Sequence, residues 1–519
     1  MCRRRLPGDL DALSADLAGR RRAGLLEGMA LLAVVATAAA LRLFALHAQP
    51  GGLYPDEAAE GYDAHRVLHL AGYHPVFFAD DAGREALYGY LVALAFRLAG
   101  ESVTVLRATS AVLGVLAVIA VYGWLRHEGR AVALGAAGWV AGSLWLICIS
   151  RDGMRNILVP VTGALALWAM TEWARRPSRN RALLAGAAMA LGLWTYQPLK
   201  LLPLLLVAWL AWLRHHDAER WRALKRGLPA LAIAYVLVGS PMLFTAVTQP
   251  GLYFGRAVGV SAAGQHTGLA ALATHTLRTL AMFALTGDPN ERHNVGGMPL
   301  LGWPLTLLAG LGAWRAWRRR RDDPLASLVL LAVPVFLIPP LVATADAAPH
   351  FLRSLGLAAP LAGLVGLGCA EVVGIRPSAM LPPLPAALLT VVLVLTGAAS
   401  AQAYFSRPVS QRYDAYRFDL VQLSDALRGD PGSSDIVLLD YYRATDIRFL
   451  NPGATVRFAD PAHDHLVRSE SPVGATACTL FALSRADLSR YADPAVAAKA
   501  RPLAFDPQGR PSVWKARCG

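Results

Sequence analysis

Acidic side chains cluster in the stretch that follows the first long apolar segment of the chain. Residues 54–63, with the sequence YPDEAAEGYD, carry Asp56, Glu57, Glu60 and Asp63. An ionised group near lipid is costly unless it has a partner or a task. A carboxylate there could act as a general base that takes the proton of an attacking hydroxyl, and Asp56 is our candidate. The alternative is that the acids simply cap the start of a helix, since acids favour helix N-termini.

A second group of charged residues follows, and later polar loops contain further candidates for binding an anionic substrate. Asp81 and Glu85 have Arg84 between them. The remaining candidates are Arg155, Lys200, His293, His350 and Arg353. Arginine suits bidentate contact with phosphate. Arg155 could instead be a snorkelling residue and Lys200 an anchor at the membrane edge.

Histidines in the same loops raise the possibility of a divalent metal ion. They could supply a ligand alongside Glu85: His266, His275, His293 and His350. Their spacing matches no compact metal motif. The sequence therefore leaves open whether the protein binds a divalent metal ion, and it indicates no other cofactor.

The composition predicts the kind of frame that must position these residues. The chain of 519 residues is 55% hydrophobic and 17% charged, with a mean hydropathy of +0.39, whereas soluble proteins carry about 25% charged residues. Apolar runs of about 20 residues recur, the length that crosses a bilayer as a helix. We therefore predict an all-α polytopic membrane protein. The net charge of +14 lies largely in short loops between these runs, which fits the positive-inside rule better than nucleic-acid binding.

Eleven membrane spans are expected from the apolar runs. They are 25–47, 103–125, 131–149, 157–174, 182–196, 198–213, 227–247, 299–317, 325–345, 352–373 and 380–400. Residues 1–24 are basic, so we assign them to the cytoplasm, and the dense arginine clusters then all fall on that side. The first extracytoplasmic loop is 48–102, with a short apolar helix at 86–98 that lies in the interface. The transmembrane domain is 25–403.

The tail, residues 404–519, differs in composition and is predicted to form a small extracytoplasmic α/β domain. Strand-like runs occur at 435–439, 454–459 and 477–483, between turns rich in Pro, Gly and Asp. Cys478 and Cys518 both lie in the tail. They could form a disulfide if the tail is outside the cytoplasm, and otherwise are two free thiols.

The polar clusters gather on the predicted extracytoplasmic side, where nucleotide-activated substrates are not available. A lipid-carried donor is the natural substitute. Transferring a sugar from a polyprenyl phosphate needs a carboxylate to deprotonate the acceptor hydroxyl and cations to neutralise the leaving phosphate. Asp56 suits the first task and Arg84, Lys200 and Arg353 suit the second. The helix at 86–98 could line a groove for the prenyl chain.

Several short motifs resemble those of the C-type (GT-C) glycosyltransferase superfamily, which includes protein O-mannosyltransferases and the aminoarabinose transferases of lipid A. In chain order they are YPDEA after the first span, GREALY at 83–88, SRDGMR at 150–155, WTYQP at 194–198, DPNERHN at 288–294 and PHFLR at 349–353. The resemblance covers about residues 25–400. It implies a multi-span fold, polyprenyl-phosphate sugars as donors, and Asp56 as the catalytic base with Glu57 as its companion. The chain has Arg84-Glu85-Ala86-Leu87 where some lipid A transferases have Glu-Lys-Pro-Pro, so their metal and lysine assignments do not transfer cleanly.

The sequence leaves two rival functions and the acceptor open. A transporter or lipid flippase for a glycolipid would also need charges near lipid, and predicts inverted-repeat hydropathy, which we do not detect. A non-catalytic scaffold with a partner-binding tail is the third hypothesis. The expected partners of the enzyme are a polyprenyl-phosphate-linked sugar, membrane lipid and an acceptor that could be a lipid, a glycan or a protein, with no nucleic acid.

Overall fold

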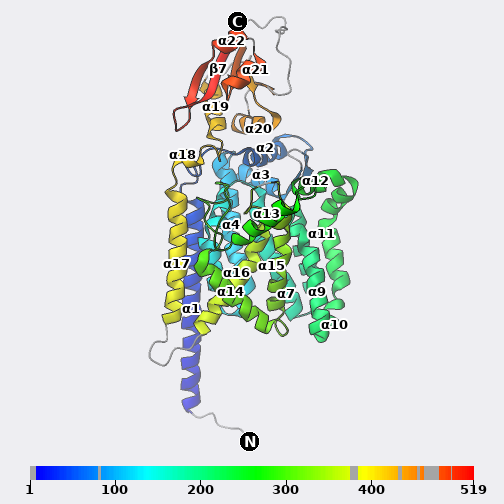
Figure 1. The fold of residues 1–519 in the computed structure, drawn as a ribbon. Helices are drawn as coiled ribbons and strands as arrows, with labels where there is room; N and C mark the ends of the chain where they lie inside the picture. The colour runs from blue at the N-terminus through cyan, green and yellow to red at the C-terminus, as the bar shows by residue number, and fades with distance from the viewer. Residues whose placement is uncertain are drawn as a thin grey trace.

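A helical bundle carries a small α/β domain on one of its ends (Figure 1). The computed structural model describes residues 7–79, 83–345, 347–374, 384–429, 435–452, 456–460, 478–492 and 494–518. The helix α1, Pro7–Leu43, is 37 residues long and extends beyond the far end of the bundle, away from the tail (Figure 1).

The bundle is built from long apolar helices, as the composition predicts. Besides α1 they are α4 (Val103–Leu125), α5 (Arg130–Gly142), α6 (Leu144–Arg151), α7 (Leu158–Arg175), α8 (Arg179–Leu191), α9 (Leu202–His216), α11 (Leu228–Thr248), α14 (Gly302–Arg319), α15 (Pro324–Val342), α16 (Ala358–Gly374) and α17 (Leu384–Phe405). Within the described residues, 8 helices are long and apolar enough to cross a membrane, and the pair α5 and α6, bent by 56°, would make up to 9. The helical, multi-span fold class is confirmed.

The number of spans stays a prediction, because two of the eleven expected segments form weaker helices. The segment 182–196 gives α8, which has only 13 residues. The segment 299–317 gives α14, which carries Arg315, Arg318 and Arg319 near its end.

Small residues allow the bundle helices to approach closely. A Cβ added at Gly186 of α8 would lie 2.1 Å from the carbonyl oxygen of Leu231 in α11. A Cβ at Gly312 of α14 would lie 1.8 Å from the carbonyl oxygen of Leu364 in α16. Close backbone packing of this kind is the usual way in which helices associate in lipid, where hydrophobic burial gives no advantage.

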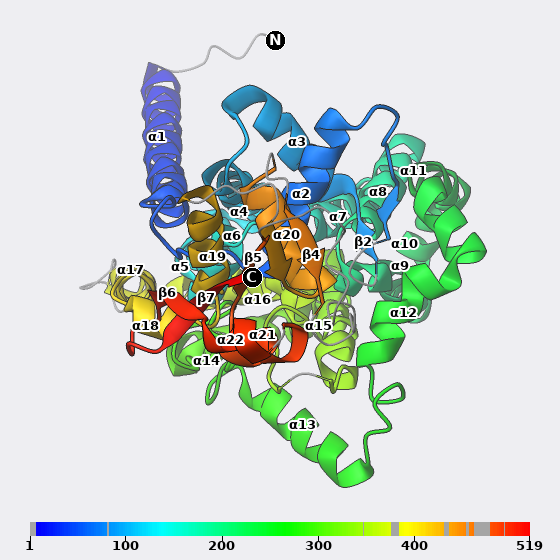
Figure 2. The ribbon, with the colours of Figure 1, turned by 90° about the horizontal axis from the view of Figure 1, so that it is seen from above.

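Short elements lie across the end of the bundle that faces the tail. They are α2 (Pro55–His69), α3 (Leu87–Ala99) and α12 (Pro250–Val260). A hairpin of β1 (Phe77–Phe78) and β2 (Arg84–Glu85) follows α2 in the chain and precedes α3. The helix α3 confirms the short apolar helix expected at 86–98. Two further short helices, α10 (Ala218–Lys225) and α13 (Leu269–Ala281), follow later in the chain. In Figure 2 α13 lies at the periphery of the molecule.

The tail contains a five-stranded sheet of order β4-β3-β5-β7-β6. Its strands are β3 (Asp435–Leu438), β4 (Arg457–Ala459), β5 (Cys478–Ala482), β6 (Arg501–Phe505) and β7 (Pro511–Cys518), and its helices are α18 (Val409–Arg412), α19 (Phe418–Gly429), α20 (Tyr441–Leu450), α21 (Arg485–Tyr491) and α22 (Pro494–Ala498). The α/β class and three expected strands are confirmed, whereas β6 and β7 were not predicted. Cys478 and Cys518 are backbone partners across β5 and β7. That register places Cα atoms about 4.5–5.5 Å apart, within the range for a disulfide, which stays a prediction.

The tail docks on the bundle through α20, which lies over α2 (Figure 2). The ring of Phe449 in α20 stacks on Phe96 of α3, with centroids 6.0 Å apart. Phe449 also covers Gly61, where an added Cβ would lie 2.5 Å from the ring. The glycine thus lets the tail approach α2 closely.

Candidate active site

The helix α2 brings four carboxylates into the buried interior between the bundle and the tail. Pro55 occupies its first turn and Asp56 and Glu57 follow, which suits a helix start, where the missing proline N–H is not needed and acids meet the positive end of the dipole. Asp56, Glu57, Glu60 and Asp63 are exposed by only 8%, 1%, 0% and 1%. Buried charges are tolerated only when they are paired, so the partners of each acid indicate its task.

Glu57 anchors α2 to the bundle. Its two carboxylate oxygens accept hydrogen bonds of 2.6 and 2.8 Å from Nε and Nη2 of Arg107 in α4. The backbone N–H of Gly153 donates a third bond, of 2.9 Å. Arg107 also binds the carbonyl oxygens of Gly51 and Gly52. These contacts fix the start of α2, and the predicted catalytic role of Glu57 stays a prediction.

Glu60 and Glu85 are joined by cations into one buried network. Arg155 donates from Nη1 to Glu60 at 2.9 Å and from Nε to Glu85 at 3.2 Å. The Nζ of Lys200 lies 3.0 Å from the other oxygen of Glu85. Burial would raise the pKa of Glu85, but Lys200 and Arg155 hold it below its usual value. The structure thus brings together the sequence-predicted residues Glu85, Arg155 and Lys200.

Arg84 joins this network from the β1–β2 hairpin. Its Nη2 lies 2.5 Å from Asp63, and its Nη1 lies 3.9 Å from Glu60. Asp81, which the sequence predicts to bind substrate, lies outside the described residues.

Asp56 differs from its neighbours because its close partner is a neutral hydroxyl. Tyr442 of α20 donates a hydrogen bond to Oδ1 of Asp56, and Nη2 of Arg256 lies 3.9 Å from Oδ2. Burial opposes ionisation, but Arg256 and Arg292 hold the pKa of Asp56 below its usual value. The nearby arginines therefore favour the ionised form of Asp56, the form in which a carboxylate can accept a proton, and its shortest ion pair among the described residues is 3.9 Å long.

Three residues of this site were missed at the sequence level. Tyr442 is 386 positions from Asp56, and no local pattern signals such a contact. Arg256 lies in an apolar helix that carried no predicted role. Arg292 lies beside the predicted His293, inside a motif that contained its signal; its guanidinium sits 3.4 Å from the ring centroid of Tyr54, and its Nη1 has no hydrogen-bond partner among the described residues.

Asp152 is a further buried acid beside this constellation. Burial, with the nearby charge of Glu57, raises its pKa to about 7, although Arg292 and Arg107 oppose the shift. A carboxyl with a pKa near neutrality can take up or release a proton during a reaction.

Two of the four histidines considered as metal ligands, His293 and His350, meet at Asp288 in a loop beside the bundle end. His275 instead hydrogen-bonds to the carbonyl oxygen of Pro340, and His266 is exposed. Oδ2 of Asp288 lies 3.1 Å from Nδ1 of His293 and accepts a 2.6 Å bond from the backbone N–H of Phe351. The rings of His293 and His350 have centroids 5.1 Å apart. These contacts join the loop that contains His293 to the loop that contains His350 and Arg353. The side chains of His350 and Arg353 are half-buried.

This cluster is where a divalent metal could bind. Asp288, His293 and His350 each offer a ligand atom, and these atoms lie within 4.8 Å of one another. The Nε2 of His293 is buried without a hydrogen-bond partner among the described residues, whereas Asp288 already accepts three hydrogen bonds. Glu85, the expected carboxylate ligand, is paired with Arg155 and Lys200 instead. The fit is partial, and a metal stays a prediction.

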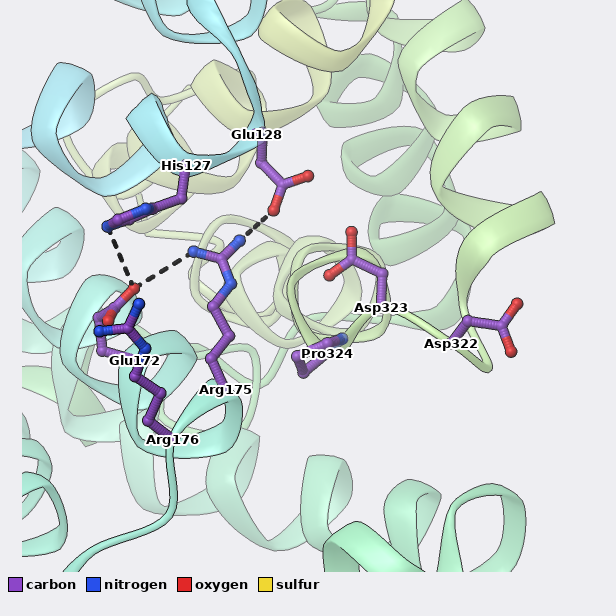
Figure 3. Close-up of a pocket in the computed structure, with 8 residues that line it drawn as sticks. All are labelled: His127, Glu128, Glu172, Arg175, Arg176, Asp322, Asp323 and Pro324. Carbon is purple, nitrogen blue, oxygen red and sulfur yellow. Dashed lines mark hydrogen bonds and ion pairs between the residues drawn. The ribbon is translucent and has the colours of Figure 1, made fainter. Parts of the chain in front are cut away.

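A second polar hollow lies at the opposite end of α4 (Figure 3). Its volume is about 260 Å³, and its lining includes Glu128, Glu172 and Arg175. Arg175 pairs with both glutamates. This end of the bundle carries arginine-rich loops, which the positive-inside rule assigns to the cytoplasm. We therefore assign the chemistry to the carboxylates of α2.

A buried carboxyl in α20, Asp446, should make the stability of the protein depend on pH. Asp446 is 0% exposed, and neither of its oxygens has a hydrogen-bond partner among the described residues. Burial raises its pKa well above the usual value, although Arg417 opposes the shift. The carboxyl of Asp446 therefore stays protonated in the folded protein at pH values at which it is ionised in the unfolded chain, where its pKa is about 3.9. The contribution of Asp446 to the free energy of unfolding should be fully present below pH about 3.9 and should decrease as the pH rises above that value.

The side chain of Asp446→Asn is neutral at every pH, so we expect the stability of this variant to fall less than that of the parent as the pH rises. The melting temperature of the variant at pH 8, relative to pH 5, should exceed that of the parent by about 1 °C, equivalent to roughly 1 kcal/mol for a chain of 519 residues. Thermal unfolding in detergent at both pH values measures it. Asp425→Asn, which changes an exposed carboxylate of α19, is the control. Equal pH slopes in parent and Asp446→Asn would contradict the burial argument.

One protein family matches part of the chain. Residues 85–244 match the family described as dolichyl-phosphate-mannose-protein mannosyltransferase. This range includes Glu85, Arg155 and Lys200 of the network. No curated protein sequence matches the chain.

Solved structures resemble the chain over most of its length. ArnT from Cupriavidus metallidurans bound to undecaprenyl phosphate has a TM-score of 0.58 at 13% identity, covering 95% of this chain and 97% of that one. The same protein in the apo state has a TM-score of 0.53 at 13% identity, covering 96% and 98%. The apo oligosaccharyltransferase of Archaeoglobus fulgidus has a TM-score of 0.51 at 13% identity, covering 84% of this chain and 65% of that one. At this identity the likeness shows a shared fold. Together with the family match over residues 85–244, it shows that the chain has the fold of the C-type glycosyltransferases that its motifs resemble.

Proposed function

We propose that the protein transfers a sugar from a polyprenyl-phosphate donor to an acceptor at the extracytoplasmic face of the membrane, with Asp56 as the base. The observation that carries the proposal is the contrast along α2. Glu57, Glu60 and Asp63 each have a cation within 2.9 Å, whereas the nearest ion pair of Asp56 is 3.9 Å long. Asp56 is thus the α2 carboxylate with the weakest ion pairing and, at 8%, the largest exposed fraction, which makes it the best placed to take the proton of an incoming hydroxyl.

The reaction needs few groups besides this base. The proton of the acceptor hydroxyl passes to the carboxylate of Asp56, and the acceptor oxygen bonds to the anomeric carbon of the donor sugar. The bond between that carbon and the phosphate oxygen breaks, and polyprenyl phosphate leaves with the bonding electrons. Cations near the leaving oxygen stabilise the charge that develops there.

Arg256 and Arg292 are the cations best placed for the leaving phosphate. Arg256 lies 3.9 Å from Asp56, and the guanidinium of Arg292 lies 3.4 Å from the ring centroid of Tyr54, two residues before Asp56. Arg292 is only 8% exposed and has an Nη1 without a hydrogen-bond partner among the described residues. An anionic ligand would satisfy that group. Arg84, Lys200 and Arg353, our first candidates for this task, remain proposals, and the first two are already held by acids.

The donor class and the active face follow from chemistry and from the sidedness of the chain. The polar constellation lies at the bundle end opposite the arginine-rich loops, which the positive-inside rule assigns to the cytoplasm. Nucleotide sugars are not available on the other face, but lipid-linked sugars are. The ArnT structure named above contains undecaprenyl phosphate, which supports a lipid phosphate as the leaving group here.

The test is sugar transfer by purified protein in nanodiscs supplied with labelled polyprenyl-phosphate sugars and membrane extract as acceptor. We expect Arg292→Ala and Arg256→Ala to lower kcat/KM for the donor by about 10- to 100-fold each, as expected for the loss of a charge-assisted hydrogen bond. Lysine at either position should restore part of the rate. Arg222→Ala, in the exposed part of α10, is the control. Full transfer by both alanine variants would exclude these arginines from the phosphate site.

A further inference from the structure

A cavity between α2 and α20 lies next to the reacting carboxylate. Its volume is about 220 Å³, and its walls include Tyr62, Asp63 and Arg84 on the bundle side. Tyr441, Tyr442 and Thr445 line it on the tail side. Neither Arg256 nor Arg292, the proposed phosphate ligands, is among its lining residues. The cavity is therefore distinct from the proposed phosphate site.

Arg84 lines the cavity, and within the part of the chain that the structure describes two of its three guanidinium nitrogens lack hydrogen bonds. Arg84 is 1% exposed, and its Nε and Nη1 have no hydrogen-bond partner among the described residues. A buried N–H without a partner costs free energy that a ligand oxygen would recover. The cavity is therefore suited to a ligand that offers oxygen acceptors to Arg84.

The charges around Arg84 argue against an anionic ligand. Asp63 lies 2.5 Å from its Nη2 and Glu60 lies 3.9 Å from its Nη1. Each acid also has a second cation, since Arg155 lies 2.9 Å from Glu60 and Arg66 lies 3.5 Å from Asp63. The charges around Arg84 are therefore already paired, and a phosphate would have to displace one of the acids. A neutral ligand with hydroxyl groups would accept from Arg84 and donate to nearby acceptors without that penalty.

The remaining walls and the size indicate a sugar. Three tyrosines, Tyr62, Tyr441 and Tyr442, supply aromatic rings with polar ends, and aromatic rings attract C–H groups to their faces while their hydroxyls form hydrogen bonds. Pockets for drug-sized ligands have volumes of about 300–1,000 Å³, so a cavity of about 220 Å³ suits one sugar ring. Tyr442 connects the cavity to the chemistry, because its hydroxyl also binds Asp56.

We propose that this cavity is the acceptor subsite and that it holds a neutral sugar unit whose hydroxyl is delivered to Asp56. The inference rests on the proposed function and narrows its acceptor to a glycan. The tail domain then supplies half of the acceptor site, and Tyr442 is a positioning residue that aligns Asp56 with the bound sugar.

Direct binding of simple sugars tests the cavity without any turnover. Full-length protein in nanodiscs is mixed with methyl glycosides of mannose, glucose, galactose and arabinose, and binding is read by saturation-transfer NMR. We expect at least one glycoside to bind and Tyr441→Ala to weaken it about ten-fold. Tyr441 is 60% exposed, so its truncation should not prevent folding. Tyr441→Phe keeps the ring and should retain most of the binding.

Three results of this experiment would overturn the inference. They are no binding by any of the four glycosides, equal binding to wild type and Tyr441→Ala, and displacement of the bound glycoside by inorganic phosphate. The last would show that the cavity is an anion site.

A kinetic experiment separates the acceptor subsite from the donor site. With a labelled polyprenyl-phosphate sugar and the glycoside that binds, Tyr441→Ala should raise KM for the glycoside about ten-fold and change KM for the donor by less than about two-fold. A rise in donor KM alone would assign the cavity to the donor sugar and overturn the inference, while the proposed function stands. If wild type consumes no donor, the proposed function fails, and the binding experiment still decides whether the cavity holds a sugar.

Discussion

Asp56→Asn should nearly abolish sugar transfer and leave the protein folded. The amide keeps the size of the side chain and an oxygen that accepts the hydrogen bond from Tyr442, but it cannot take the proton of the acceptor. General-base catalysis contributes about 10²- to 10⁴-fold to rates, so we expect kcat to fall by that factor. The nanodisc transfer assay with labelled donor measures the rate, and thermal unfolding checks the fold.

The control for this substitution is Asp322→Asn, an exposed carboxylate at the other end of the bundle. It should transfer sugar at the wild-type rate. Undiminished transfer by Asp56→Asn at normal expression would reject the role of Asp56. Asp152, with a pKa of about 7, would then be the next candidate for the base.

The bundle could be predicted from the sequence because helices in lipid are encoded locally. Runs of about 20 apolar residues mark them, and ten of the expected segments appear as single helices, with 131–149 appearing as the bent pair α5 and α6. The number of spans was harder to predict, because some apolar segments are short. For example, α8 has only 13 residues, so its length does not decide whether it spans the membrane. In the tail, β6 and β7 carry prolines and charged residues, which blurred the strand pattern.

The site could be predicted only in part, because its geometry depends on contacts between distant segments. The sequence pointed to Glu85, Arg155 and Lys200, which do meet. It had no signal for Tyr442, which reaches Asp56 only because α20 packs on α2. Composition also gave no physical reason to prefer Asp56, our candidate base, over Glu57, since it describes adjacent acids alike. Neighbouring helix residues point in different directions, and this difference of direction gives the two acids different partners.

Glu57→Gln should therefore unfold the protein rather than slow its chemistry. The substitution removes the charge that Arg107 faces at 2.6 and 2.8 Å, and Arg107 is only 2% exposed. Breaking a buried ion pair on one side costs about 3–5 kcal/mol, because the other charge is left without compensation. We expect a large fall in melting temperature and in the yield of folded protein in detergent.

A double-mutant cycle distinguishes this anchoring role from catalysis. Removing both charges, as in Glu57→Leu with Arg107→Met, leaves no uncompensated charge and should be far less destabilising than Arg107→Met alone. Such a double variant with near-normal stability and measurable transfer would confine Glu57 to holding α2 in place. If Glu57→Gln instead melts like wild type and loses transfer as Asp56→Asn does, Glu57 acts in the reaction itself. The two adjacent acids would then share the chemistry, and the contrast on which the assignment of Asp56 depends would disappear.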